Sequence, residues 1–105
     1  MKTKHKFTEI EISSIIAQIL RGIEFLHNNG VMHRDIKLDN ILLAELQPTI
    51  KVKIADFSLA ELIKDKPGPL NKCGTPGFMA PEIFCEENYD ERCDIFSAGV
   101  ILFIL

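Results

Sequence analysis

The decisive stretch of this 105-residue chain is His33-Arg34-Asp35-Ile36-Lys37-Leu38-Asp39-Asn40. It places a carboxylate, an ammonium group two residues on and a carboxamide five residues on within one tight turn. A second acid, Asp56, ends a predicted strand that would return beside this turn. Two oxygen ligands next to a cation suit Mg²⁺ and phosphate, because Mg²⁺ prefers few protein oxygens together with phosphate oxygens.

A polar turn capped by Asp and Asn is the alternative interpretation of this stretch, and for any single Asp it is the more common one. At equal residue frequencies, however, the pattern H-R-D-x-K-x-x-N arises by chance in roughly one chain in thirty thousand of this length. The full pattern therefore favours a functional loop.

Composition excludes several classes of protein. Apolar residues make up 47% and charged residues 26%, as in an ordinary globular chain with room for one domain. Twelve Lys and Arg against fifteen Asp and Glu, with no Trp, argue against a nucleic-acid partner. Three cysteines without a C-x-x-C pair argue against a disulfide framework or a zinc site. They favour a reducing compartment, and we expect a cytoplasmic protein.

Local patterns predict a long helix followed by a hairpin. Thr8 and Glu11 form a capping box ahead of isoleucines and leucines at helical spacing. Gly30 suits the left-handed position that follows a helix, so we expect a helix over about 9–29. The apolar run 41–43 and the alternation of Ile and Val with Lys over 50–54 predict a small β-hairpin.

The second half of the chain begins irregularly and ends in an apolar helix. Repeated Pro and Gly exclude one long element over 56–80, and Pro81 suits the first position of a short helix. Residues 95–105 are almost entirely apolar but too few to cross a bilayer, which needs about 20, so we expect a buried helix and no membrane partner. A helix that is apolar on every side needs other elements around it, and the chain therefore looks cut.

These motifs, in this order, resemble those of eukaryotic protein kinases. Residues 33–40 resemble the catalytic loop, Asp56-Phe57-Ser58 stands where D-F-G is expected, and Ala80-Pro81-Glu82 matches A-P-E. Residues 94–100 resemble the start of the family's central buried helix. The resemblance covers essentially the whole chain, and within the family the calcium/calmodulin-dependent and calcium-dependent groups are the most similar. It implies an α+β fold, the mainly helical C-terminal lobe with a small β-hairpin, truncated on both sides.

The resemblance implies a reaction and assigns roles to the loop. The reaction is transfer of the γ-phosphate of ATP to protein hydroxyls, with Mg²⁺ as cofactor. Asp35 would be the catalytic base, Lys37 would steady the γ-phosphate, and Asn40 and Asp56 would hold the metal. Leu42 would form the apolar floor under adenine, with simple core packing as the alternative. Three further residues, His33, Phe57 and Asp94, resemble parts of the internal scaffold.

The resemblance also implies a substrate class. Lys37 two residues after Asp35 is typical of Ser/Thr kinases, and Thr75 would hydrogen-bond to both. Pro76 and Met79 would line the pocket for the residue after the phosphoacceptor. The implied partners are protein substrates with Ser or Thr acceptors, together with calcium/calmodulin-type regulation of the parent enzyme.

The resemblance implies that Arg34 takes part in control of the activation segment, which here includes residues 59–74. In this family an arginine next to the catalytic Asp usually binds a phosphate on that segment. No Ser, Thr or Tyr lies between Leu59 and Gly74, and Asn71 occupies the position of the usual phosphoacceptor. We therefore expect control without phosphorylation of the segment. The alternative is that Arg34 simply binds backbone carbonyls.

Two features depart from the family pattern. No G-x-G-x-x-G occurs, and no ATP-anchoring lysine precedes the catalytic loop, so we expect residues 1–105 to be a partial kinase domain that is inactive alone. Ser58 replaces the D-F-G glycine, and because glycine permits backbone angles that serine finds costly, we expect a stiffer segment or a slightly displaced Asp56. The alternative function is a non-catalytic pseudokinase or gene fragment acting at most as a protein-binding module.

Overall fold

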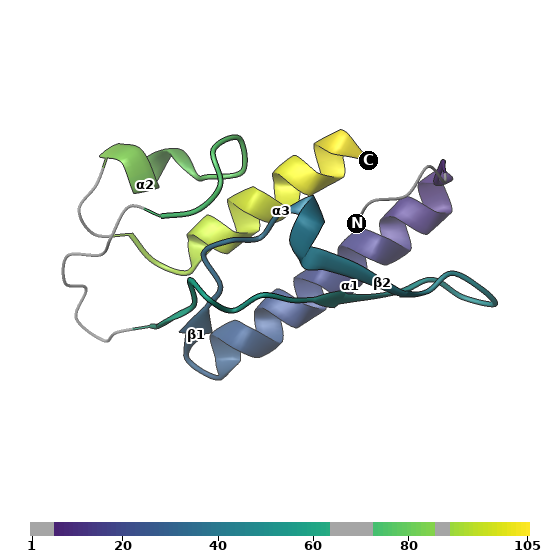
Figure 1. Ribbon diagram of the computed structural model, residues 1–105, viewed down its shortest axis with the longest axis horizontal. Helices are drawn as coiled ribbons and strands as arrows, with labels where there is room; N and C mark the ends of the chain where they lie inside the picture. The colour runs from purple at the N-terminus through teal and green to yellow at the C-terminus, as the bar shows by residue number, and fades with distance from the viewer. Residues whose placement is uncertain (1–5, 64–72, 86–88) are drawn as a thin grey trace.

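The computed structural model describes residues 6–63, 73–85 and 89–105. Two long helices lie beside a β-hairpin in an α+β arrangement (Figure 1). The elements in chain order are α1 (Glu9–Asn28), β1 (Val31–Met32), the 3₁₀ helix η1 (Leu38–Asn40), β2 (Ile41–Glu45), β3 (Lys51–Ile54), β4 (Glu61–Leu62), α2 (Pro81–Cys85) and α3 (Arg92–Ile104).

Helix α1 confirms its predicted capping and nearly its predicted length. The Thr8 hydroxyl accepts from the Glu11 backbone N–H, and the Glu11 carboxylate accepts from the Thr8 N–H. The helix ends at Asn28, and Gly30 follows with a φ of +76°. One face of the helix enters the main core, whose buried members are Ile15, Ile19, Ile23, Ile36, Ile41, Ile50, Ala98 and Ile101.

The predicted hairpin is confirmed, and a side chain of α1 holds it. Strands β2 and β3 pair antiparallel, with Ile41 opposite Ile54. The Gln18 amide donates to the Ile50 carbonyl at 2.9 Å and accepts from the Val52 N–H at 3.0 Å. Gln18 thereby satisfies backbone groups that the partner strand does not reach, and it fixes the hairpin against the helix.

A second, shorter strand pair brackets the loop that the sequence singles out. Strand β1 precedes this loop and pairs antiparallel with β4, with Val31 opposite Leu62 and Met32 opposite Glu61. The chain therefore leaves α1, runs through residues 33–40, forms the hairpin and returns beside β1.

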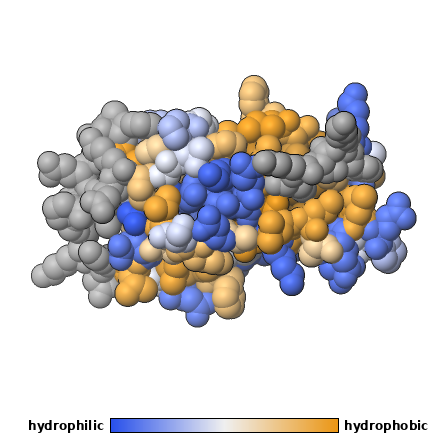
Figure 2. All heavy atoms as spheres, in the orientation of Figure 1, coloured by the Kyte–Doolittle hydropathy of each residue, from blue (hydrophilic) through white to orange (hydrophobic). Residues whose placement is uncertain are grey.

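Helix α3 runs from Arg92 to Ile104 and contains the apolar run expected from Ile95, and the Asp90 carboxylate accepts from the Arg92 N–H at its start. The helix packs against α1. Hydrophobic side chains gather on the surface over its C-terminal half (Figure 2), and its exposed apolar residues are Ile95, Phe96, Leu102, Phe103 and Ile104. Within the described ranges, no helix combines the length and hydrophobicity that a membrane crossing requires.

Candidate active site

The turn after β1 converges on the carboxylate of Asp35. The Asn40 amide donates to the Asp35 carbonyl at 2.8 Å and to its Oδ2 at 3.2 Å. Lys37 Nζ lies 3.9 Å from the same Oδ2. The hydroxyl of Thr75, from a distant segment, donates to Asp35 Oδ1 at 2.8 Å. The structure therefore brings four of the predicted site residues together around one carboxylate.

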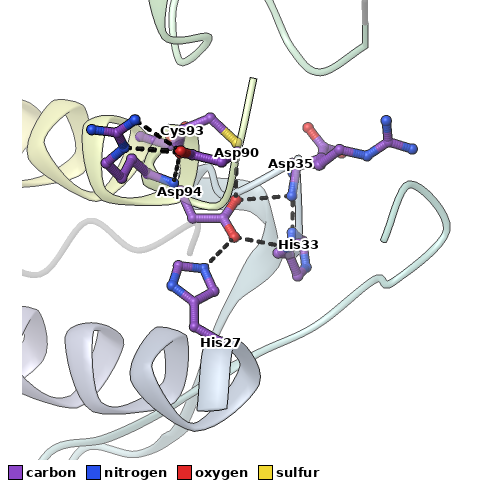
Figure 3. Close-up of polar contacts among 9 residues, drawn as sticks. His27, His33, Asp35, Asp90, Cys93 and Asp94 are labelled. Carbon is purple, nitrogen blue, oxygen red and sulfur yellow. Dashed lines mark hydrogen bonds and ion pairs between the residues drawn. The ribbon is translucent and has the colours of Figure 1, made fainter. Parts of the chain in front are cut away.

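Figure 3 shows the buried carboxylate of Asp94 pointing toward the backbone of this turn, with His27 on its other side. Its Oδ2 accepts from the His33 N–H at 2.7 Å and pairs with His27 Nε2 at 3.0 Å. Its Oδ1 accepts from the Arg34 N–H at 2.9 Å. Asp94 lies near the start of α3 and has no exposed surface. Helix α3 therefore fixes the turn that carries Asp35.

His33 is a buried histidine whose ring links the turn to the end of β3. Its Nδ1 accepts from the Asp35 N–H at 3.1 Å, so Nε2 carries the proton and donates to the Ala55 carbonyl at 2.9 Å. The Phe57 ring meets it edge-on at a centroid distance of 5.0 Å. Both ring nitrogens are engaged by the backbone, which gives His33 a structural place in the site.

Asp56 follows β3 and lies beside the turn. The Ala55 N–H donates to the Asn40 carbonyl at 2.8 Å, which joins the two segments. Asp56 is exposed and has a φ of +58°. Hydrogen bonds from the Ser58 hydroxyl and N–H lower the pKa of the Asp56 carboxyl, and the Lys37 ammonium group acts in the same direction.

The backbone at Ser58 does not adopt a positive φ, although serine stands where the family has glycine. Within the described ranges, the residues other than glycine with positive φ are Arg34 and Asp56. Ser58 therefore avoids the angles that would require glycine. The left-handed residue is the aspartate, a residue type that tolerates this region better than most.

The oxygen atoms of Asn40 and Asp56 fit a magnesium ion that takes its remaining ligands from phosphate groups and water. Asn40 donates through its amide nitrogen to Asp35, which leaves its amide oxygen as the atom for a cation. Asp56 adds a carboxylate at the same end of the hairpin. In the described part of the chain, no three His, Cys, Asp or Glu side chains gather to hold a metal unaided. One carboxylate and one amide with phosphate oxygens is the coordination that Mg²⁺ favours.

The segment around Thr75 is fixed from two sides. A Cβ added at Gly74, whose φ is +125°, would meet the Arg34 carbonyl oxygen at 3.1 Å. The Ser97 hydroxyl of α3 donates to the Phe78 carbonyl at 2.6 Å. Met79 packs partly buried against the second core, which comprises Met32, Ala80, Ile83, Tyr89 and Cys93. Pro76 is exposed, so these two predicted pocket residues differ in accessibility.

The Arg34 side chain contacts two other segments, residues 59–61 and Tyr89. Its Nε donates to the Leu59 carbonyl at 2.7 Å, its Nη1 donates to the Tyr89 hydroxyl at 3.1 Å, and its Nη2 lies 3.9 Å from Glu61 Oε2. Burial opposes the charge, yet the bond with Tyr89 and nearby negative groups raise the pKa of Arg34. A backbone carbonyl is thus one of its partners. Asn71 lies outside the described residues.

Leu42 is half exposed, at 51%, on β2. The core-packing alternative for this residue is therefore wrong, and its apolar side chain stands on the surface of the hairpin, where Leu42 pairs with Lys53. The sequence did not indicate that Gln18 would hold the hairpin, or that Glu61 and Tyr89 would contact Arg34. Tyr89 is the chain's single tyrosine, but nothing local to it signals a partner 55 positions away.

Comparison with known proteins places the chain in a family. Calcium/calmodulin-dependent protein kinase type 1 of Caenorhabditis briggsae is 39% identical over 102 residues, which cover 97% of this chain and 28% of the relative. The type II kinase of the same organism is 42% identical over 99 residues, covering 94% of this chain and 19% of the relative. Human ribosomal protein S6 kinase alpha-4 is 41% identical over 108 residues, covering 100% of this chain and 14% of the relative.

The chain thus spans less than a third of the length of these relatives. The family model of the protein kinase domain matches residues 1–105, the whole of this chain. The turn, the buried aspartate beneath it and the hairpin beside it therefore belong to a protein kinase domain, and the chain is a member of that family.

Proposed function

We propose that these residues form the catalytic-loop part of a Ser/Thr protein kinase, in the C-terminal lobe of the domain. The observation that carries the proposal is the convergence of Asn40, Lys37 and Thr75 on the Asp35 carboxylate. A carboxylate held by two donors, with an ammonium group nearby, is oriented to accept a proton from an incoming hydroxyl.

The mechanism follows from the placement of each group. Asp35 accepts the proton of the substrate hydroxyl, and Thr75 and Asn40 keep its two oxygens in position. Lys37 neutralises phosphate charge beside it. Asn40 and Asp56 would hold Mg²⁺, which, bound with ATP, supplies charge neutralisation on the transferred phosphate. Leu42 offers an apolar surface for the adenine ring.

Specificity for Ser and Thr would reside in the segment after Gly74. Thr75 links this segment directly to Asp35, so the acceptor hydroxyl and the peptide backbone are positioned by one connected unit. Pro76 and Met79 lie next along the chain and would contact the residue after the acceptor. The substrates would accordingly be proteins that present Ser or Thr in an extended segment.

Regulation of the parent enzyme would not require phosphorylation of the activation segment. Arg34 already binds the Leu59 carbonyl and the Tyr89 hydroxyl, and it faces Glu61. The names of two relatives carry calcium/calmodulin dependence, which favours control of that type. Asn71→Glu in an active parent should raise turnover modestly, by adding a carboxylate for Arg34. Unchanged or lower turnover, or an activating phosphate mapped to Ser58, would argue against this scheme.

A chimera tests the catalytic proposal. The matching segment of Caenorhabditis elegans calcium/calmodulin-dependent protein kinase type 1, 39% identical over 102 residues, is replaced by this chain, and peptide phosphorylation is measured. Asp35→Asn should lower kcat by about 10²–10⁴ with little change in the KM for ATP, since proton acceptance is lost and the metal ligands remain. Asp39→Asn, an exposed acid in the same turn, is the matched control and should leave kcat unchanged.

The second candidate function is a non-catalytic binding module, favoured by the lack of any G-x-G-x-x-G in the sequence. The same chimera separates the two candidates. Equal kcat for the Asp35→Asn and unsubstituted chimeras would refute the catalytic role. We expect the 105 residues alone to show no turnover and no tight MgATP binding, because a ligand pocket normally covers most of its ligand. Calorimetry with MgATP checks this, and micromolar affinity would contradict it.

A further inference from the structure

Ser58 makes a contact that glycine at the same position could not make. Its hydroxyl donates to Asp56 Oδ1 at 2.7 Å, and its backbone N–H donates to the same oxygen at 3.2 Å. The N–H bond is open to any residue other than proline. The hydroxyl bond, the shorter of the two, exists only because serine follows Asp56 and Phe57.

The backbone around Asp56 is already fixed on both sides. Before it, the Ala55 N–H donates to the Asn40 carbonyl and the Ala55 carbonyl accepts from His33. After it, the Phe57 ring packs edge-on against His33. The carboxylate itself is exposed, so the freedom left to Asp56 is mainly rotation of its side chain. The Ser58 hydroxyl restricts that rotation.

Both Ser58 bonds use Oδ1 and therefore leave Oδ2 of Asp56 to other partners. Asn40, the other predicted metal ligand, is joined to this segment through the Ala55 N–H. We infer that Ser58 is a positioning residue that holds the Asp56 carboxylate with Oδ2 toward a divalent cation shared with Asn40. This inference rests on the proposed function, because it takes Asp56 and Asn40 as the metal ligands.

The size of the effect follows from one hydrogen bond to an exposed carboxylate. Loss of such a bond frees the side chain, and the cation must then restrict it on binding. Divalent-cation affinity should fall by about two- to tenfold. Ser58→Thr keeps the hydroxyl and should restore the affinity. Because φ at Ser58 is not positive, the β-branched residue meets no left-handed backbone there.

Mn²⁺ binding to the 105-residue chain, read as the loss of the free-ion signal in electron paramagnetic resonance, tests the inference without nucleotide or turnover. The unsubstituted chain should bind Mn²⁺ more tightly than Ser58→Ala by about two- to tenfold, and Ser58→Thr should match the unsubstituted chain. Ser13→Ala, at an exposed site on α1, is the matched control and should change nothing.

Asp56→Asn separates the two ways in which the result can be negative. Equal affinity of the unsubstituted chain and Ser58→Ala, with both above Asp56→Asn, would overturn the positioning role and leave the metal ligands of the proposed function in place. Equal affinity of the unsubstituted chain and Asp56→Asn would overturn Asp56 as a metal ligand, and the inference with it. A Ser58→Thr variant as weak as Ser58→Ala would also refute the role of the hydroxyl.

Discussion

Replacement of Asp94 by Asn tests whether the buried carboxylate holds the turn that carries Asp35. Asp94 has no exposed surface, and its two oxygens accept from the His33 and Arg34 backbone N–H groups at 2.7 and 2.9 Å. His27 Nε2 lies 3.0 Å from one of the same oxygens. Asparagine has the same shape but a single acceptor oxygen, so one backbone N–H must then face an NH₂ group.

The expected loss in the free energy of unfolding is the sum of the changes in the two backbone hydrogen bonds. A hydrogen bond to a charged group contributes about 1.5–3 kcal/mol, and one of the two backbone bonds is lost outright. The other becomes a neutral bond and weakens by about 1 kcal/mol. Asp94→Asn should therefore lower the free energy of unfolding by about 3 kcal/mol. This is a large share of the total for a small domain, about 5–15 kcal/mol.

Urea unfolding followed by far-ultraviolet circular dichroism measures this loss. With an m-value of about 1.5 kcal/mol per M, a loss of about 3 kcal/mol lowers the midpoint by about 2 M. Asp90→Asn is the matched control, four residues away, because the Asp90 and Arg92 side chains are 42% and 82% exposed. An exposed pair of this kind contributes about 0–1 kcal/mol. Equal midpoints for the two variants would refute the argument that Asp94 anchors the turn.

Three further predictions concern stability and reactivity. Gly30→Ala should lower the free energy of unfolding by about 1–2 kcal/mol, because Gly30 has a φ of +76°. Gly99→Ala, whose added Cβ meets no atom within 4 Å, should raise it by about 0.5–1 kcal/mol. Urea midpoints that move in the same direction for both variants would contradict this. Gln18→Ala should accelerate amide hydrogen exchange at Val52, whose N–H loses its acceptor, and unchanged exchange would show that another group replaces it. Burial, with the charge of Asp94, raises the pKa of the Cys93 thiol, so its contribution to stability is complete below about pH 9 and is lost as the pH rises further. Alkylation of the folded protein at pH 8 should accordingly modify the partly exposed Cys73 faster than the buried Cys93. Equal alkylation rates of these two cysteines, measured by mass spectrometry, would contradict the burial of the Cys93 thiol.

The elements that the sequence predicted are those whose causes lie within a few residues. The capping box joins Thr8 to Glu11, three positions on, and Gly30 ends α1 through its own φ. The hairpin follows from alternation along each strand. The chain's place among protein kinases also came from the order of short motifs. Such signals are local, because they depend on helical spacing, pleating or the conformation of single residues.

Contacts between distant segments required the tertiary structure. The Arg34 bond to Tyr89 spans 55 positions, and the Asp94 bond to the His33 N–H spans 61. Neither contact leaves a periodic pattern in the sequence, because each depends on how α3 and the residues just before it pack against the turn. Ser58 illustrates the difference most directly. Its identity predicted a stiffer segment or a displaced Asp56, whereas only the fold shows that the positive φ lies at Asp56 and that the serine hydroxyl binds the Asp56 carboxylate. A residue's torsion angles are set by its neighbours' packing as well as by its own type.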